Sequence, residues 1–327
     1  MTDYHNLRIN RSKKPKVRAG SVRLYNMAGI LVVLILVFFV FCGILKSSGN
    51  SKVPKPKWDG SSAFSVVLNT QPVSVVVYNP NSKKITQVKL NDELYTQTGD
   101  VTEPLKKITT ASGDGEALSK VATYATRAPV YNYIILKNRD EVNEVNMEKY
   151  FGNFVSFVTP VRVLLFGSGF ADTNIARFDL LRLWWQAKGL STNNLDLVET
   201  SNRTQNIILA GGEKVLGVDD VSMQRLFGQY MENSKVLEEG AEVNIINASG
   251  SIDAYKLASD LVYSVGGRVG AISANEQKQP TTVIRVRSSS YSASYLAKVF
   301  DCDIKSVPNI PTGKIELVLG ADFLTKY

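Results

Sequence analysis

The chain has 327 residues, 44% of them hydrophobic and 21% charged, and a formal net charge of +8. This composition excludes a disordered protein, because it supplies enough apolar side chains for a folded core. Positive charge spread over a folded surface would suggest a nucleic-acid partner. Here residues 1–26 hold seven Lys and Arg residues against one acid, Asp3, so only +2 remains for all later residues. We therefore expect no nucleic-acid partner.

Residues 27–45, MAGILVVLILVFFVFCGIL, form an uncharged apolar run. Its length is close to the ~20 residues of a membrane-spanning helix and exceeds the apolar part of a cleaved signal peptide. Basic residues stay on the cytoplasmic side of a membrane. We therefore expect a single-pass cell-membrane protein, with residues 1–26 as a cytoplasmic tail and residues 27–45 as a transmembrane helix. Residues 46–60 carry Pro54 and Pro56 and predict a linker to an extracytoplasmic part.

Residue usage limits the chemistry that this extracytoplasmic part can perform. The single histidine, His5, lies in the tail, and Cys302 is the only cysteine after the predicted span. These facts exclude Ser-His-Asp and Cys-His catalysis and any His-rich metal site. Chemistry must therefore use carboxylates, lysines, arginines or a metal held by oxygen. Modification of the Asn-X-Ser/Thr triplets at Asn202 and Asn247 is left open by the sequence.

Residues 61–235 predict an α/β domain. Residues 64–69, 73–79 and 85–90 are β-rich, and the last two surround the turn NPNSKK, which predicts a hairpin. Further strands are predicted at residues 131–137 and 154–166, and helices at residues 116–126, 140–151 and 219–233.

A further helix is predicted in ARFDLLRLWWQAKG, residues 176–189. Its apolar face comprises Phe178, Leu181, Trp184 and Trp185, and its polar face comprises Asp179, Arg182 and Gln186. We expect the apolar face to pack in the core. Gly189 follows the helix, as glycine often does at a helix end.

Residues 240–327 predict a second domain. Strands are expected at residues 243–247, 268–273, 282–287 and 314–319, and helices at residues 253–265 and 292–300. The order βαββαβ is that of a ferredoxin-like fold, in which right-handed crossovers place both helices on one face of the sheet. The strand at residues 282–287 could form an exposed docking edge.

The first connection of this domain, NASGS, resembles a phosphate-binding loop, but it has only one glycine and no Lys-Ser/Thr ending. We therefore predict a plain turn, in which Gly250 adopts a left-handed conformation and Ser251 or Asp253 caps the next helix.

The segments VNIINASG, TTVIRV, SYLAKVF and IELVLGADF resemble the C-terminal domain of the LytR family, and LGADF at residues 319–323 is the most specific of them. Residues 62–200 resemble a shortened, degenerate LytR-CpsA-Psr catalytic domain, through the hairpin VSVVVYNPNSKKITQVKL, the helix and strand EALSKVATYATRAPVYNYIILKN, and ADTNIARFDLLR. The resemblance implies an exported envelope protein with an α/β fold. It also implies transfer of glycopolymers from polyprenyl pyrophosphate to peptidoglycan, using arginines, acids and Mg²⁺.

The chain departs from this family at the positions that carry the chemistry. The first hairpin strand of the family opens with Arg-X-Asp-Ser/Thr, where this chain has QPVS at residues 71–74; only Ser74 matches. The second strand ends in Pro-Arg-Asp in the family and in LNDE at residues 90–93 here. The family also spaces two arginines three apart, whereas Arg177 and Arg182 are five apart, about 140° around a helix.

A transferase would therefore depend on Asp92, Arg177 and Arg182, with Asp92 and Glu93 as Mg²⁺ ligands. A solvated loop and ordinary surface charges are the simpler interpretation of these four residues. Three functions follow: a non-catalytic envelope protein that binds wall glycopolymer, peptidoglycan or an envelope protein; a glycopolymer transferase; and a scaffold of an envelope secretion or division complex. We expect no cofactor, and Mg²⁺ only for the transferase.

Overall fold

The computed structural model describes residues 58–98, 101–107, 114–136, 171–188, 190, 192–209, 211–251, 253–275 and 277–327. Residues 54–327 form one compact unit. The predicted tail, the predicted span, most of the linker, the helix at 140–151 and the strand at 154–166 lie outside the described residues. Within the described ranges, no helix is long and apolar enough to cross a membrane.

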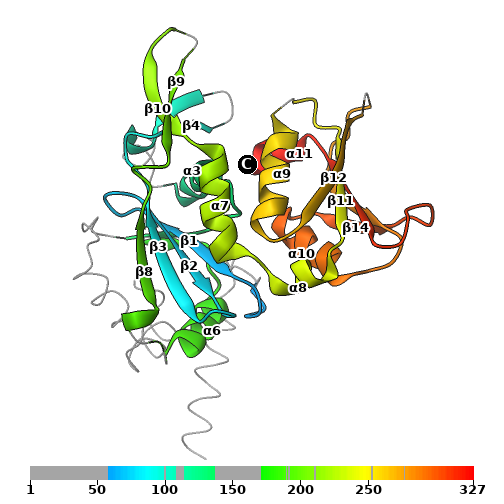
Figure 1. The fold of residues 1–327 in the computed structure, drawn as a ribbon, viewed down its shortest axis with the longest axis horizontal. Coiled ribbons are helices and arrows are strands. Elements are labelled where there is room, and N and C mark those ends of the chain that lie inside the picture. Colours follow the sequence, from blue (N-terminus) through cyan, green and yellow to red (C-terminus); the bar gives the residue numbers. More distant parts are fainter. Residues whose placement is uncertain are drawn as a thin grey trace, which may run out of the picture. The chain divides into compact units, whose positions relative to one another are not determined.

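A six-stranded sheet organises the first half of this unit (Figure 1). Its strands, in spatial order, are β7 (Asp172–Thr173), β6 (Asn132–Ile135), β1 (Phe64–Leu68), β2 (Ser74–Asn79), β3 (Lys84–Lys89) and β8 (Leu195–Glu199). β1, β2 and β3 form an antiparallel meander, while β6 is parallel to β1 and β8 is parallel to β3. The predicted hairpin and the predicted strand at 131–137 are confirmed.

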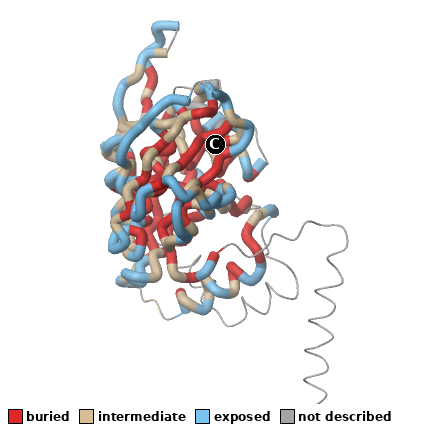
Figure 2. Tube along the Cα trace, turned by 90° about the vertical axis from the view of Figure 1, so that its right-hand side faces the viewer, coloured by how far each residue is buried: buried red, intermediate tan, exposed pale blue. Residues whose placement is uncertain are grey.

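Helices cover both faces of this sheet. They are α3 (Gly115–Thr126), α6 (Arg177–Ala187) and α7 (Asp220–Met231). Because side chains alternate along a strand, Val75 and Val77 of β2 pack with α3 and α7, whereas Val76 and Tyr78 pack with α6. Buried residues follow the strands between these layers (Figure 2). The α/β class is therefore confirmed for this half, as are the helices at 116–126 and 219–233.

The predicted orientation of α6 is wrong. Asp179 and Leu180 are buried, whereas Phe178 is 50% and Trp185 is 64% exposed. Asp179 faces inward because its Oδ2 accepts a hydrogen bond from the Trp58 backbone N–H at 3.5 Å. The helix has apolar residues on two sides, so its periodicity alone did not indicate the buried one.

Two hairpins were not predicted. They consist of β4 (Tyr95–Thr98) with β5 (Val101–Pro104), and of β9 (Thr204–Ile208) with β10 (Lys214–Val218). The second hairpin projects from the top of the view and is largely exposed at its end (Figure 2). Its β9 sequence, TQNII, shows no polar–apolar alternation, because β9 has no buried face. A short 3-10 turn, Thr192–Asn194, precedes β8.

The second half of the unit contains a five-stranded sheet. Its order is β12 (Arg268–Ala274), β11 (Glu242–Asn247), β15 (Lys314–Leu319), β13 (Val283–Val286) and β14 (Asp303–Ser306). The helices are α8 (Ser234–Glu239), α9 (Ala254–Ser264), α10 (Tyr291–Val299) and α11 (Asp322–Lys326). Residues of α9 and α10 share one core cluster with β11, β13 and β15. This common core confirms that both main helices cover the same face.

The four-stranded ferredoxin-like prediction is corrected by this order. A fifth strand, β14, is present, and each crossover joins strands that are direct parallel neighbours, β11 with β12 and β13 with β14. β15 then lies between the two crossover units. β14 was missed because all four of its residues, DIKS, are exposed. The suggested docking edge at 282–287 is also wrong, because β13 is paired on both sides.

The turn after β11 is as predicted at Gly250, which has φ +87°. Asn247 holds this turn, since its Nδ2 donates to the Ser251 carbonyl at 2.7 Å and its Oδ1 accepts from the Ser249 hydroxyl at 2.7 Å. Asp253 occupies the N-cap position of α9 without a side-chain hydrogen bond to the helix. The turn is therefore built by asparagine and glycine, and the predicted cap by Asp253 is not formed.

Four charged residues join α3, α7 and α9; we call them the Arg127 cluster: Arg127, Asp220, Lys256 and Asp260. Arg127 lies at the end of α3 with φ 55°, and its Nε donates to Asp220 Oδ1 at 2.8 Å. Arg127 Nη1 lies 3.8 Å from Asp260 Oδ2, and Lys256 Nζ lies 2.6 Å from Asp220 Oδ2. The cluster thus links the two sheets' helices through charge.

Asp260 should make the stability of the protein depend on pH. Burial raises its pKa from 3.8 to about 6, although Arg127 acts against this. The folded state therefore holds the proton more tightly than the unfolded state, and this stabilising contribution is lost as pH rises from about 4 to about 6. We expect Asp260→Asn to remove that fall in stability. Urea unfolding of both proteins across this pH range measures the effect. The prediction would be contradicted if the free energy of unfolding changed equally with pH in the two proteins.

Candidate functional site

The two hairpin segments that depart from the family motifs, residues 71–74 and 90–93, lie side by side. β2 and β3 pair Ser74 with Lys89, and the Leu90 N–H donates to the Val73 carbonyl at 2.8 Å. Asp92 Oδ1 then accepts a hydrogen bond from the Val73 N–H at 3.2 Å. The hairpin therefore brings residues 71–74 and 90–93 to the same end of the six-stranded sheet.

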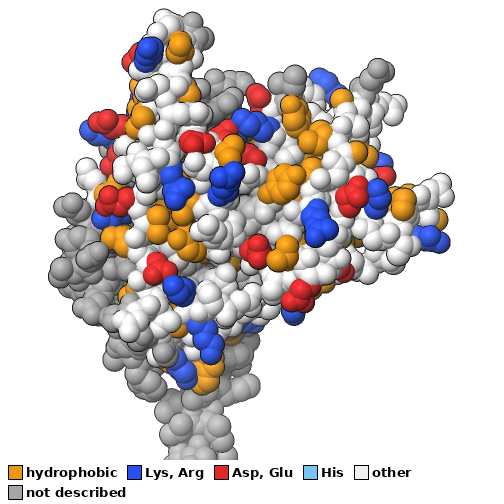
Figure 3. Space-filling model, in the orientation of Figure 1, with side chains coloured by type: hydrophobic (Ala, Val, Ile, Leu, Met, Phe, Trp, Pro, Cys, Tyr) orange, Lys and Arg blue, Asp and Glu red, His pale blue; other side chains and the backbone are white. Residues whose placement is uncertain are grey.

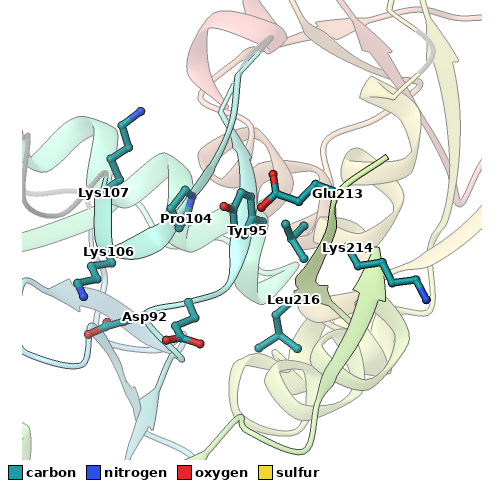
Figure 4. A pocket seen from close by; sticks show the side chains of 10 residues that line it. Asp92, Tyr95, Pro104, Lys106, Lys107, Glu213, Lys214 and Leu216 are labelled. Atoms are coloured by element: carbon teal, nitrogen blue, oxygen red, sulfur yellow. The ribbon is translucent and has the colours of Figure 1, made fainter. Parts of the chain in front are cut away.

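Two cavities open at this end. One has a volume of about 590 Å³ and is lined by Asp92, Glu93, Tyr95, Pro104, Lys106, Lys107 and residues 213–216 (Figure 4). The other, of about 450 Å³, is lined by residues 71–72, 89–93, Lys106 and 199–201. Both include Asp92, Glu93 and Lys106, so they adjoin; together they are called the Asp92 cleft. Their volumes fall in the range of ligand sites, roughly 300–1,000 Å³.

The charges of the larger cavity cancel. Its lysines are Lys106, Lys107 and Lys214, and its acids are Asp92, Glu93 and Glu213. In Figure 4, the Lys106 side chain reaches towards Asp92, and the Glu213 carboxylate lies beside Tyr95. No arginine lines either cavity among the described residues. A pyrophosphate needs concentrated positive charge and fork-shaped donors, and the lining supplies neither.

The second cavity has the same character. Lys89 Nζ lies 3.7 Å from Glu199 Oε1, so this lysine is matched by an acid. The cavity also contains the polar side chains of Gln71, Asn91 and Ser201. The whole cleft therefore presents hydrogen-bond donors and acceptors without an excess of positive charge.

The predicted Mg²⁺ ligands do not fit that ion. One oxygen of Asp92 is engaged by the Val73 N–H, and Glu93 is exposed. In the described part of the chain, no three His, Cys, Asp or Glu side chains come close enough to hold a metal. Mg²⁺ prefers near-octahedral oxygen ligands, so we derive no step through a metal.

The two predicted arginines are not brought to the cleft. β1 runs parallel to β3, with Phe64 at the Ile85 level and Leu68 at the Lys89 level. Arg182 donates to the Trp58 carbonyl, before the start of β1, whereas Asp92 follows the end of β3. Arg182 and Asp92 therefore lie at opposite ends of the sheet. Arg177 is exposed at the start of α6, on the sheet face opposite α3 and α7.

Ser74, the one residue that matches the first family motif, is fully buried. Its hydroxyl accepts from Thr70 Oγ1 at 3.0 Å and donates to the Pro72 carbonyl at 3.3 Å. These bonds fix the approach to β2 and leave the hydroxyl inaccessible to a ligand. Cys302 is equally inert, because burial raises the pKa of its thiol to about 12.

Sequence reasoning missed the cleft residues Tyr95, Lys106 and Lys214. They come from β4, from the segment after β5 and from β10, and Lys214 lies more than a hundred positions after the other two. Only the packing of β4 against β10 brings them together. The hint in the sequence was limited to the polar, lysine-bearing stretch after the first hairpin.

Asp92 should be important for stability rather than for chemistry. Asp92→Ala removes the acceptor of the partly buried Val73 N–H, so we expect a loss of about 1 kcal/mol in the free energy of unfolding. Asp92→Asn retains a carbonyl oxygen at this position and should remain within a few tenths of a kcal/mol of the original protein. Urea denaturation of the three proteins decides this, and equal losses for both variants would refute the role of the acceptor.

No family model matches the chain, and no curated protein matches it. Similar solved structures include Bacillus subtilis TagV, with 10% identity over 51% of this chain and 94% of that one, at a TM-score of 0.38. The Lin1025 protein from Listeria innocua shares 11% identity over 52% and 97%, at a TM-score of 0.37.

A third similar structure is the LytR-CPS2A-psr family protein YwtF (TagT), solved with bound octaprenyl pyrophosphate lipid. It shares 11% identity over 55% of this chain and 94% of that one, at a TM-score of 0.35. The likeness to these three structures is weak, at 10–11% identity and TM-scores of 0.35–0.38. It does not by itself establish membership of the family or an activity.

Proposed function

We propose that this chain is a single-pass, membrane-anchored protein of the cell envelope that binds wall glycopolymer in the Asp92 cleft without transferring it. The apolar run at 27–45 and the basic tail support the anchoring. The resemblance of residues 62–200 and 242–323 to LytR-type domains supports the envelope setting. The observation that carries the binding role is the balanced charge of the cleft.

A glycan is a polyhydroxylated chain that is recognised through many hydrogen bonds and an apolar surface. The cleft offers both, because lysines and carboxylates line the same cavity as the half-buried ring of Tyr95. The two adjoining cavities together extend from Ser201 to Lys214, which suits a chain of sugars better than a single small molecule.

Transfer would require more than binding. The leaving pyrophosphate has to be stabilised as its bond breaks, which depends on arginines or a metal placed at the phosphates. In the described residues, Arg182 is held at the far end of the sheet, and the acids of the cleft do not form a metal site. Binding is therefore the better supported role.

Residues 54–327, a compact unit, are suitable for the test. We expect this fragment to bind purified wall glycopolymer, and Tyr95→Ala with Lys106→Ala to weaken binding about tenfold, equal to 1.4 kcal/mol. Tyr263→Ala with Lys305→Ala is the matched control, because both residues are exposed and lie in the five-stranded half. Equal binding by both variants would remove the cleft from the proposal.

The same fragment tests the transferase alternative. It is incubated with polyprenyl-pyrophosphate-linked glycopolymer, peptidoglycan and Mg²⁺, and covalent attachment is measured. Attachment that depends on Asp92, Arg177 or Arg182 would overturn the non-catalytic assignment. The scaffold alternative predicts instead that the fragment captures an envelope protein and no polymer.

A further inference from the structure

The outward face of α6 combines aromatic and basic side chains. Phe178 and Trp185 are exposed and stand seven residues apart, so they lie on the same side of the helix, about 10 Å from each other. Arg177, Arg182 and Lys188 surround them, and all three are exposed. We call these five residues the α6 outer face.

Three of the five residues are basic. The sole acid of α6, Asp179, is 4% exposed and pairs with Arg182, whose Nη1 lies 3.7 Å from Asp179 Oδ1, so Arg177 and Lys188 supply the outward positive charge. Lys188 Nζ lies 3.2 Å from the centroid of the Trp185 ring, a cation–π contact that places an ammonium directly over the exposed aromatic. Figure 3 shows Lys or Arg side chains next to hydrophobic ones in the region of α6.

The aromatics cannot turn inward, because the opposite side of α6 is already packed. Leu180 and Ala187 belong to the core cluster on this side of the sheet. Gln186 Nε2 donates to the Gly60 carbonyl at 2.9 Å, which fixes the rotation of the helix further. Exposure of Phe178 and Trp185 is thus a property of the fold and not of a loosely packed helix.

The chain that leads from the predicted membrane span reaches the folded unit at α6. Arg182 donates to the Trp58 carbonyl, and the Trp58 N–H donates to Asp179. Twelve residues, 46–57, separate the end of the predicted span from Trp58. They reach about 40 Å at full extension, so a span at residues 27–45 would limit the distance between Trp58 and the bilayer surface to about that length.

We propose that the α6 outer face docks on the lipid bilayer, with Phe178 and Trp185 in the headgroup region and Arg177 and Lys188 on anionic headgroups. Tryptophan, phenylalanine and basic residues are the side chains that favour this zone of a membrane. The proposal rests on the proposed membrane anchoring. It also gives the anchoring a direction: because the Asp92 cleft lies at the other end of the sheet, docking turns the cleft away from the membrane and towards the wall.

A sedimentation assay with vesicles tests this surface on residues 54–327, which lack the predicted span. The probe is vesicles of equimolar phosphatidylcholine and phosphatidylglycerol. We expect the fragment to co-sediment, and Phe178→Ser with Trp185→Ser to reduce partitioning at least about tenfold. Ile208→Ser is the matched control, because Ile208 is 68% exposed on β9, in a separate two-stranded sheet; it should sediment like the unmodified fragment.

Two further readouts distinguish insertion into lipid from self-association of the fragment. Vesicles should shift the tryptophan emission to the blue, and Trp185→Phe should abolish the shift while sedimentation persists. Lys188→Gln with Arg177→Gln should weaken binding only when phosphatidylglycerol is present. The proposal would be overturned if the fragment did not sediment with vesicles, or if the double serine variant sedimented equally. It would also be overturned if the double serine variant lost self-association but kept its binding to vesicles. Glycopolymer binding should be unchanged in the serine variant, so this surface and the cleft can fail independently.

Discussion

Replacing Gly320 by alanine is expected to destabilise the five-stranded half by at least about 1–3 kcal/mol, the usual cost of overpacking. A Cβ at this position would stand 2.6 Å from the Thr282 backbone nitrogen and even closer to the Thr281 carbonyl carbon. Both neighbours are backbone atoms next to β13, and the Gly320 N–H already donates to Thr282 Oγ1 at 3.1 Å. The new methyl group can be accommodated only if the ends of β13 and β15 separate.

Gly228→Ala provides the matched control. Gly228 lies inside α7, and a Cβ there would meet nothing within 4 Å. The same chemical change should therefore stabilise the protein by about 0.5–1 kcal/mol, because alanine favours a helix. Urea unfolding of both variants measures the difference in sign. A Gly320→Ala protein as stable as the original would show that the contact with Thr282 is relieved without cost.

Three residues of the segment LGADF have defined structural roles. Asp322 Oδ1 accepts from the Thr282 N–H at 2.6 Å and from the Thr282 hydroxyl at 2.7 Å. Gly320 allows the close approach of the chain after β15 to Thr282, the hydrogen bonds of Asp322 stabilise this approach, and Phe323 is buried in the core. Gly320 and Asp322 thus both contact Thr282, which directly precedes β13 and lies more than thirty positions earlier in the chain.

Elements with one buried face were predictable from periodicity. The hairpin of β2 and β3 and the helices α3, α7, α9 and α10 appear within a few residues of their expected positions. Elements without a buried face were harder to predict. β9 and β14 were missed because their side chains are mostly exposed, whereas β12 was predicted although it is mostly exposed too. For α6 the pattern was present but misleading, because apolar residues lie on two sides of the helix.

The candidate site was only half predictable. The position of Asp92 opposite Val73 follows from the hairpin register, which the sequence indicates. The other walls come from β4 and β10, and their meeting depends on tertiary packing that no local pattern encodes. For the same reason the sequence grouped Arg182 with Asp92, although the strand directions place them at opposite ends of the sheet.

Arg127→Ala is expected to cost about 2–3 kcal/mol of unfolding free energy, somewhat less than the 3–5 kcal/mol for breaking a fully buried pair. The Arg127 side chain is 17% exposed, and its guanidinium Nη2 lies 2.6 Å from Asp220 Oδ1. Removing it leaves two carboxylates, Asp220 and Asp260, beside a single exposed lysine, Lys256. The pKa of Asp260 should then rise further, because the charge that lowered it is gone.

Three variants separate charge from packing in this cluster. Arg127→Lys keeps the charge but not the fork of donors, so it should retain part of the stability. Arg225→Ala removes an exposed arginine from the same helix layer and should change the free energy of unfolding by less than about 0.5 kcal/mol. Asp260→Asn added to Arg127→Ala should recover part of the loss, because the unpaired carboxylate is no longer present. Losses that add without such recovery would show that Arg127 acts through packing alone, and the charge link between α3, α7 and α9 would then have no energetic role.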